Sequence, residues 1–112
     1  MSTPAQLRIK PGVSIIGLHP AMHTAQIAAC GVWGSHGFSE CWITSGTEGS
    51  HSWGSRHYSG MAIDFRTVKL DKGYNWRQVK DDLAKYLGDE FDVVLENTHI
   101  HVEFHPKNGA AV

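Results

Sequence analysis

Two short segments of this chain combine histidine and carboxylate side chains at spacings that suit a zinc site. The first covers residues 55–64 and has the sequence Ser-Arg-His-Tyr-Ser-Gly-Met-Ala-Ile-Asp, and the second is His-Ile-His at residues 99–101. Catalytic zinc takes three protein ligands, often imidazole and carboxylate, and keeps a fourth position for water. A three-ligand zinc site with an open position usually indicates hydrolysis.

We expect the zinc ligands to be His57, Asp64 and His101. His57 and Asp64 are seven residues apart, and Gly60 between them lets the backbone pass close to an ion. His101 comes from a distant segment and completes the set. Two neutral imidazoles and one carboxylate leave the metal with a net positive charge. That charge lowers the pKa of bound water and polarises a carbonyl group.

Hydrolysis also needs a base, and Glu96 is our candidate. If residues 97–98 form a two-residue turn, Glu96 and His99 flank it and share one face with His101. We expect His99 to hydrogen-bond the tetrahedral intermediate or to help transfer the proton. His51 precedes His57 by six residues and is expected to approach the site from the other side.

Three further side chains near the motifs are candidate substrate-binding residues, namely Ser55, Arg56 and Arg66. Either arginine could hold a substrate carboxylate, because guanidinium pairs well with carboxylates. The alternative is that both arginines are surface charges or members of internal ion pairs. For these residues the sequence leaves both interpretations open.

Each feature also has an ordinary structural explanation when it is taken alone. A His-x-His pair on a strand is more often a surface or core pair than a metal site, and Glu96 and Glu103 would simply be solvated. No site role is assigned to four other histidines, His19, His23, His36 and His105. The joint occurrence of both motifs is what favours the metal site.

The segments that carry the motifs have clear periodicities. Residues 62–66 alternate and predict a strand whose Ile63 and Phe65 face the core while Asp64 faces the other way. Residues 91–96 and 99–104 predict a hairpin. The other expected elements are a helix opened by Pro20 and running to about 33, a strand at 40–44, a loop at 45–58, and a helix after Asn75 that continues to about Leu87.

Length and composition predict one soluble domain covering residues 1–112. The net charge of −1 provides no basic surface for nucleic acid. No segment is long enough to span a membrane, and the first ten residues lack the apolar run of a signal peptide. We therefore expect a monomer that is cytoplasmic as synthesised, with Cys30 and Cys41 as unpaired thiols.

Together the two segments give the pattern Ser-x-His-x-x-Gly-x-Ala-x-Asp followed by His-x-His. This pattern resembles that of the M15-type zinc peptidases, which include D-alanyl-D-alanine carboxypeptidases and L-alanyl-D-glutamate endopeptidases. Their relatives include lysostaphin-type peptidases and hedgehog signalling domains. The similarity extends from about residue 43 to 104, and the matching positions are Ser55, His57, Gly60, Ala62, Asp64, His99 and His101.

The resemblance implies an α+β fold with a small central antiparallel sheet and flanking helices. It implies zinc held by His57, Asp64 and His101, and hydrolysis of an amide bond in a peptidoglycan stem peptide. Many members carry an acidic residue three positions before the final ligand, where this chain has Thr98. Glu96 is closer to the hedgehog arrangement. A histidine six positions before the first ligand, as at position 51, is also found in the hedgehog loop.

These observations favour a zinc metallopeptidase, either a D,D-carboxypeptidase or an endopeptidase. It would act on the cell wall after release, as a phage endolysin, or as a virion component. The alternative is a zinc-stabilised binding module that does not catalyse, because hedgehog domains use this scaffold for recognition. A third possibility is a histidine-rich structural protein without metal.

Overall fold

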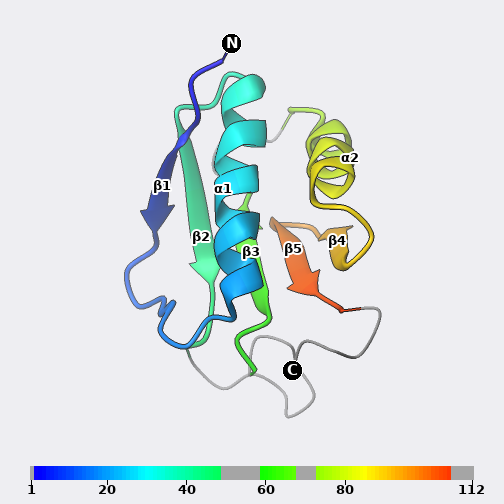
Figure 1. The fold of residues 1–112 in the computed structure, drawn as a ribbon. Coiled ribbons are helices and arrows are strands. Elements are labelled where there is room, and N and C mark those ends of the chain that lie inside the picture. Colours follow the sequence, from blue (N-terminus) through cyan, green and yellow to red (C-terminus); the bar gives the residue numbers. More distant parts are fainter. Residues whose placement is uncertain (1, 49–58, 68–72, 107–112) are drawn as a thin grey trace.

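The computed structural model describes residues 2–48, 59–67 and 73–106, and its ribbon is shown in Figure 1. In chain order the elements are β1 (Gln6–Ile9), α1 (Pro20–Ser35), β2 (Glu40–Ser45), β3 (Ala62–Arg66), α2 (Trp76–Leu87), β4 (Phe91–Leu95) and β5 (His99–Phe104). Both predicted helices, the strands near 40 and 62, and the C-terminal hairpin are confirmed. Strand β1 was not predicted from the sequence.

Within the described residues the strands form one sheet in the order β1-β2-β3-β5-β4. The β1 and β2 strands are parallel and are connected through α1, whereas every other neighbouring pair is antiparallel. A parallel pair needs a long crossover connection, which the helix provides. The α+β class is therefore confirmed, but the sheet is mixed, and the prediction of an antiparallel sheet was wrong in this respect.

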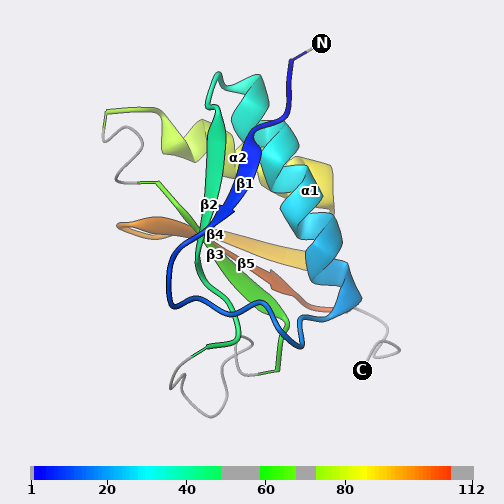
Figure 2. The ribbon, with the colours of Figure 1, turned by 90° about the vertical axis from the view of Figure 1, so that its left-hand side faces the viewer.

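Both helices pack against the same face of the sheet. Helix α1 lies along one side of the twisted sheet in Figure 2, and α2 lies beside α1 and contacts β4. The core between helices and sheet contains large, fully buried side chains, including Met22, Trp33, Phe65, Leu83 and Ile100. Burial of this apolar surface is the main source of stability. We call the opposite face, which bears Asp64, Arg66, His99, His101 and Glu103, the outer face.

The first turns of both helices are capped by side chains, of which Asn75 was predicted from the sequence and His19 was not. At α1 the imidazole of His19 accepts a hydrogen bond from the backbone N–H of Ala21, and Pro20 occupies the first turn. At α2 the side chain of Asn75 accepts one from the N–H of Gln78. These caps satisfy backbone donors that have no partner within the helix.

The hairpin has the predicted register. Residues 97–98 form its turn, and the backbone N–H of Glu96 donates to the carbonyl of His99 at 2.9 Å. Along β5 the buried residues Ile100 and Val102 alternate with half-buried His99 and His101. Period-two alternation therefore places the two imidazoles on the outer face.

Two predictions about the chain as a whole concern its thiols and its relation to membranes. Cys30 and Cys41 are free thiols, with Cys41 buried and Cys30 half-buried, as expected. Among the described residues, neither helix has the length and apolar character needed to cross a bilayer.

Candidate functional site

The candidate site lies where β3 and β5 run side by side. In this antiparallel pair Asp64 is directly opposite His101, and Arg66 is opposite His99. Directly opposite side chains on one face of a sheet are in contact. The fold therefore brings together a carboxylate and an imidazole that are 37 residues apart in the chain.

Asp64 and His101 form the closest contact of the site. The Nδ1 of His101 donates a hydrogen bond to Oδ1 of Asp64 at 2.7 Å. The other carboxylate oxygen, Oδ2, lies 3.6 Å from Nε2 of His99. Only 14% of the Asp64 side chain and 21% of the His101 side chain are exposed. The carboxylate is thus held between two imidazoles in a partly desolvated position.

The protonation of His101 follows from these contacts. The hydrogen bond to Asp64, with a smaller contribution from Glu103, raises the pKa of His101 to about 9, although burial acts in the opposite direction. At neutral pH the metal-free imidazole is therefore charged and donates from both ring nitrogens. A metal that binds at Nδ1 must displace the proton there.

The donor set of this pair fits zinc. Zinc binds imidazole nitrogen and carboxylate oxygen at about 2.0–2.2 Å, so two ligand atoms on one ion lie at most about 4.4 Å apart. The Nδ1 of His101 and the Oδ1 of Asp64, at 2.7 Å, meet this limit. The third predicted ligand, His57, lies outside the described residues, as do His51, Ser55 and Arg56.

Glu103 is a site residue that the sequence analysis missed. Its Oε1 accepts a hydrogen bond from Nε2 of His101 at 2.8 Å, so the imidazole is held at both nitrogens. Burial alone would raise the pKa of Glu103, but the hydrogen bond and charge of His101 lower it below its ordinary value. Carboxylates that bind the far nitrogen of a metal-binding histidine orient the ring and increase its basicity. The i, i+2 spacing from His101 was the available signal.

Glu96 is placed on the outer face, but it does not contact the pair. The residue is exposed beside the turn, and its side chain makes no hydrogen bond or ion pair with any residue of the described segments. It lies opposite His99, one step along the sheet from the Asp64–His101 pair. Its role as a base stays a prediction.

Arg66 borders the site with its guanidinium group over an aromatic ring. The guanidinium carbon lies 5.0 Å from the centre of the Trp42 ring, within the range of a cation–π contact. In the strand pairing Arg66 lies opposite His99, two residues from the predicted ligand His101. Substrate binding by Arg66 stays a prediction.

Two histidines without a predicted role have structural contacts. His19 caps α1 and packs against the ring of Phe104 at a centroid distance of 5.0 Å. His36 follows α1, and its Nε2 lies 2.7 Å from a carboxylate oxygen of Asp82 on α2. Both imidazoles therefore connect elements of the fold and have structural roles.

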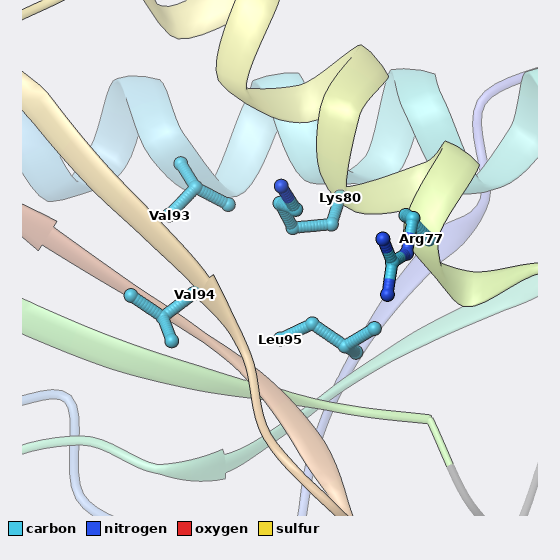
Figure 3. A pocket seen from close by; sticks show the side chains of 5 residues that line it. All are labelled: Arg77, Lys80, Val93, Val94 and Leu95. Carbon is cyan, nitrogen blue, oxygen red and sulfur yellow. The ribbon is translucent and has the colours of Figure 1, made fainter.

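A groove of about 350 Å³ lies elsewhere, between α2 and the edge strand β4 (Figure 3). The described residues that line it are Arg77, Lys80, Val93, Val94 and Leu95. These supply two cations and apolar surface but no carboxylate or imidazole, the groups that a zinc hydrolase needs. Among the described residues, this groove therefore offers no ligand for the predicted zinc site.

Comparisons with protein-family models, with curated proteins and with solved structures found no match to this chain.

Proposed function

We propose that the protein is a zinc-dependent metallopeptidase that hydrolyses amide bonds in peptidoglycan stem peptides. The observation that carries the proposal is the direct contact of Asp64 with His101 across two strands, with Glu103 bound to the far nitrogen of the same imidazole. This combination is typical of a histidine oriented to bind metal. The fold would be that of the M15-type peptidases and hedgehog domains, which the motifs resemble.

In this proposal His57, Asp64 and His101 hold the metal. When bound, zinc supplies a Lewis acid that activates water and polarises the amide carbonyl. Glu103 keeps the His101 ring oriented so that Nδ1 points toward Asp64. The partly buried position of the pair strengthens its electrostatic interactions relative to bulk water.

The other site residues handle protons and substrate. Glu96 takes a proton from the attacking water as the new carbon–oxygen bond forms, and returns it to the leaving nitrogen as the carbon–nitrogen bond breaks. His99 and His51 donate hydrogen bonds to the oxygen that gains negative charge. The residues Ser55, Arg56 and Arg66 bind the substrate, with the arginines paired to its carboxylates.

The biological setting follows from the substrate. A single domain that cleaves stem peptides would act as a monomer on the bacterial cell wall, either after release as a phage endolysin or as a virion component. Whether it trims terminal residues or cuts cross-links depends on the bond that it recognises.

The second candidate is a zinc-stabilised binding module without turnover. The position of Glu96 favours it, because in the described residues this side chain makes no hydrogen bond or ion pair with Asp64, His99 or His101. A base that does not reach the site would leave metal binding intact and chemistry absent. The two functions differ in one measurable property, the release of products.

Cleavage of purified muropeptides, followed by mass spectrometry, separates the two. The zinc-loaded protein should release products whose masses identify the cut bond, and a chelator should stop the release. Glu96→Gln should lower the rate by about 10²–10⁴-fold with unchanged zinc content. Asp81→Asn is the control, because Asp81 pairs with Lys80 on α2 at 2.7 Å and takes no part in the proposed chemistry. No release by zinc-loaded wild type would favour the binding module.

A further inference from the structure

A second group of possible ligands lies at the far end of the hairpin. The carboxylates of Asp92 and Glu103 and the imidazole of His105 each offer one atom, and these three atoms lie within 4.8 Å of one another. The Nε2 of His105 is 2.7 Å from Oε2 of Glu103 and 3.6 Å from Oδ2 of Asp92. This cluster is distinct from the Asp64–His101 pair.

We propose that Asp92, Glu103 and His105 form a second binding site for a divalent cation. Two carboxylates and one imidazole suit a first-row transition ion such as Zn²⁺. They also bring two formal negative charges, which match the charge of the ion. The site goes beyond the proposed peptidase function and does not depend on it.

The backbone holds the three residues in place. Asp92 on β4 lies directly opposite Glu103 on β5, so the sheet fixes the separation of their two carboxylates. His105 follows β5 immediately, and its backbone N–H donates to the carbonyl of Glu90 at 2.6 Å. Ligands on paired strands with a fixed register lose less conformational entropy on binding than ligands on a loose chain.

Solvent access completes the argument for this site. The side chains of Asp92 and His105 are 61% and 45% exposed, so an ion can enter and water can fill its remaining coordination positions. Exposure also implies weaker binding than at the more enclosed Asp64–His101 pair. We therefore expect the second ion to bind less tightly than the first.

Glu103 is shared by the two sites. Its Oε1 accepts a hydrogen bond from His101, and its Oε2 faces His105. A substitution of Glu103 would therefore disturb both sites at once. Asp92 and His105 are not ligands of the proposed first site, so substituting them removes ligands of the second site alone.

Calorimetric titration of the metal-free full-length protein with ZnCl₂ tests the proposal. Wild type should bind two ions, one more weakly than the other. Asp92→Asn and His105→Ala should each lose at least tenfold in affinity for the weaker ion and keep the tighter one. The matched control is His23→Ala, which removes an exposed imidazole on α1. This variant should bind both ions as wild type does. Asp64→Asn should lose the tighter ion and keep the weaker.

The proposal is overturned if Asp92→Asn and His105→Ala bind zinc with the stoichiometry and affinities of wild type. If wild type binds one ion only, loss of that ion in Asp92→Asn supports the second site and counts against the Asp64–His101 site. Loss of that ion in Asp64→Asn alone would support the Asp64–His101 site and overturn the second site. Should both variants misfold, the imidazole NMR signals of His105 in wild type decide, because they must shift as the weaker ion binds.

Discussion

The imidazole of His101 is held by one carboxylate at each nitrogen, Asp64 at Nδ1 and Glu103 at Nε2. If the proposed zinc ion binds Nδ1 of His101 together with Asp64, Glu103 stays bound to Nε2 and acts on the ion through the imidazole. That would give a positioning role to a residue that the sequence alone suggested was merely solvated.

Replacing Glu103 with Gln tests that role. The amide keeps the size of the side chain but loses its charge, so the His101 ring should be less basic and less firmly oriented. We expect zinc affinity at the Asp64 site to fall about 10–100-fold, measured by competition with a chromophoric chelator. The control Asp81→Asn should leave the affinity unchanged, and an equally unchanged Glu103→Gln would disprove the positioning role.

The metal-free protein should be less stable at alkaline pH because of His101. Its pKa is about 9 in the folded protein and 6.5 ordinarily, so the charged form stabilises the fold. This contribution is complete below pH 6.5 and is lost as the pH rises through 9. The free energy of unfolding, measured with urea at pH 6, 7.5 and 9.5, should fall across this window.

His101→Gln supplies the control for the pH dependence. This variant cannot gain or lose the proton, so the decrease between pH 6.5 and 9 should be smaller in it than in wild type. His23→Gln, which alters an exposed imidazole, should retain the wild-type decrease. Equal pH profiles in wild type and His101→Gln would contradict the assignment.

Strand β3 is positioned by the backbone that enters it. The glycine of the first motif, Gly60, has a φ of +76°, a conformation that suits glycine. A Cβ at this position would collide with the carbonyl oxygen of Gly17, while the carbonyl of Gly60 accepts a hydrogen bond from the N–H of His19. The motif glycine thus joins the start of α1 to the strand that carries Asp64.

Gly60→Ala should therefore destabilise the protein by more than the backbone strain of an alanine at positive φ. The matched control is Gly37→Ala, since Gly37 has a φ of +88° but open space where a Cβ would be. We expect the control to cost about 1 kcal/mol and Gly60→Ala to cost clearly more, measured by urea unfolding. Equal decreases in the free energy of unfolding would show that the close approach to Gly17 does not contribute to the cost of the substitution.

The elements differ in how well the sequence predicts them. Period-two alternation and a two-residue turn were enough to predict β3 and the hairpin, and with them the face shared by His99 and His101. Strand β1 was missed because Gln6–Ile9 is short, carries only two apolar residues and is mostly exposed. The parallel pairing of β1 with β2 depends on how α1 packs on the sheet and where β2 begins after it. Sequence periodicity does not contain this information.

The site was predictable in part for the same reason. The motifs singled out Asp64 and His101 as zinc ligands; the structure shows their side chains in contact, and their role as ligands stays a prediction. Period-two alternation along β5 is compatible with Glu103 on the face of His101, but it could not show that the carboxylate reaches Nε2 of His101 or that Asp92 lies opposite. Those contacts follow from strand pairing and side-chain rotamers, which depend on the whole sheet.

At the scale of the whole molecule, the two faces of the sheet differ in character. In the described residues the helices bury one face in an apolar core, and the outer face carries Asp64, His99, His101 and Glu103. A metal that binds only the folded arrangement of Asp64 and His101 must stabilise the fold. Added zinc should raise the melting temperature of wild type, measured by calorimetry, and should raise that of Asp64→Asn much less.

Crystals of the zinc-loaded protein, with anomalous scattering measured at the zinc absorption edge, test the central claim most directly. We predict that the anomalous peak marks a zinc ion bound to Asp64 and to Nδ1 of His101. His57 should be the third protein ligand, and one position should be left to solvent. Zinc bound only at other residues, with the Asp64–His101 hydrogen bond intact, would contradict the account.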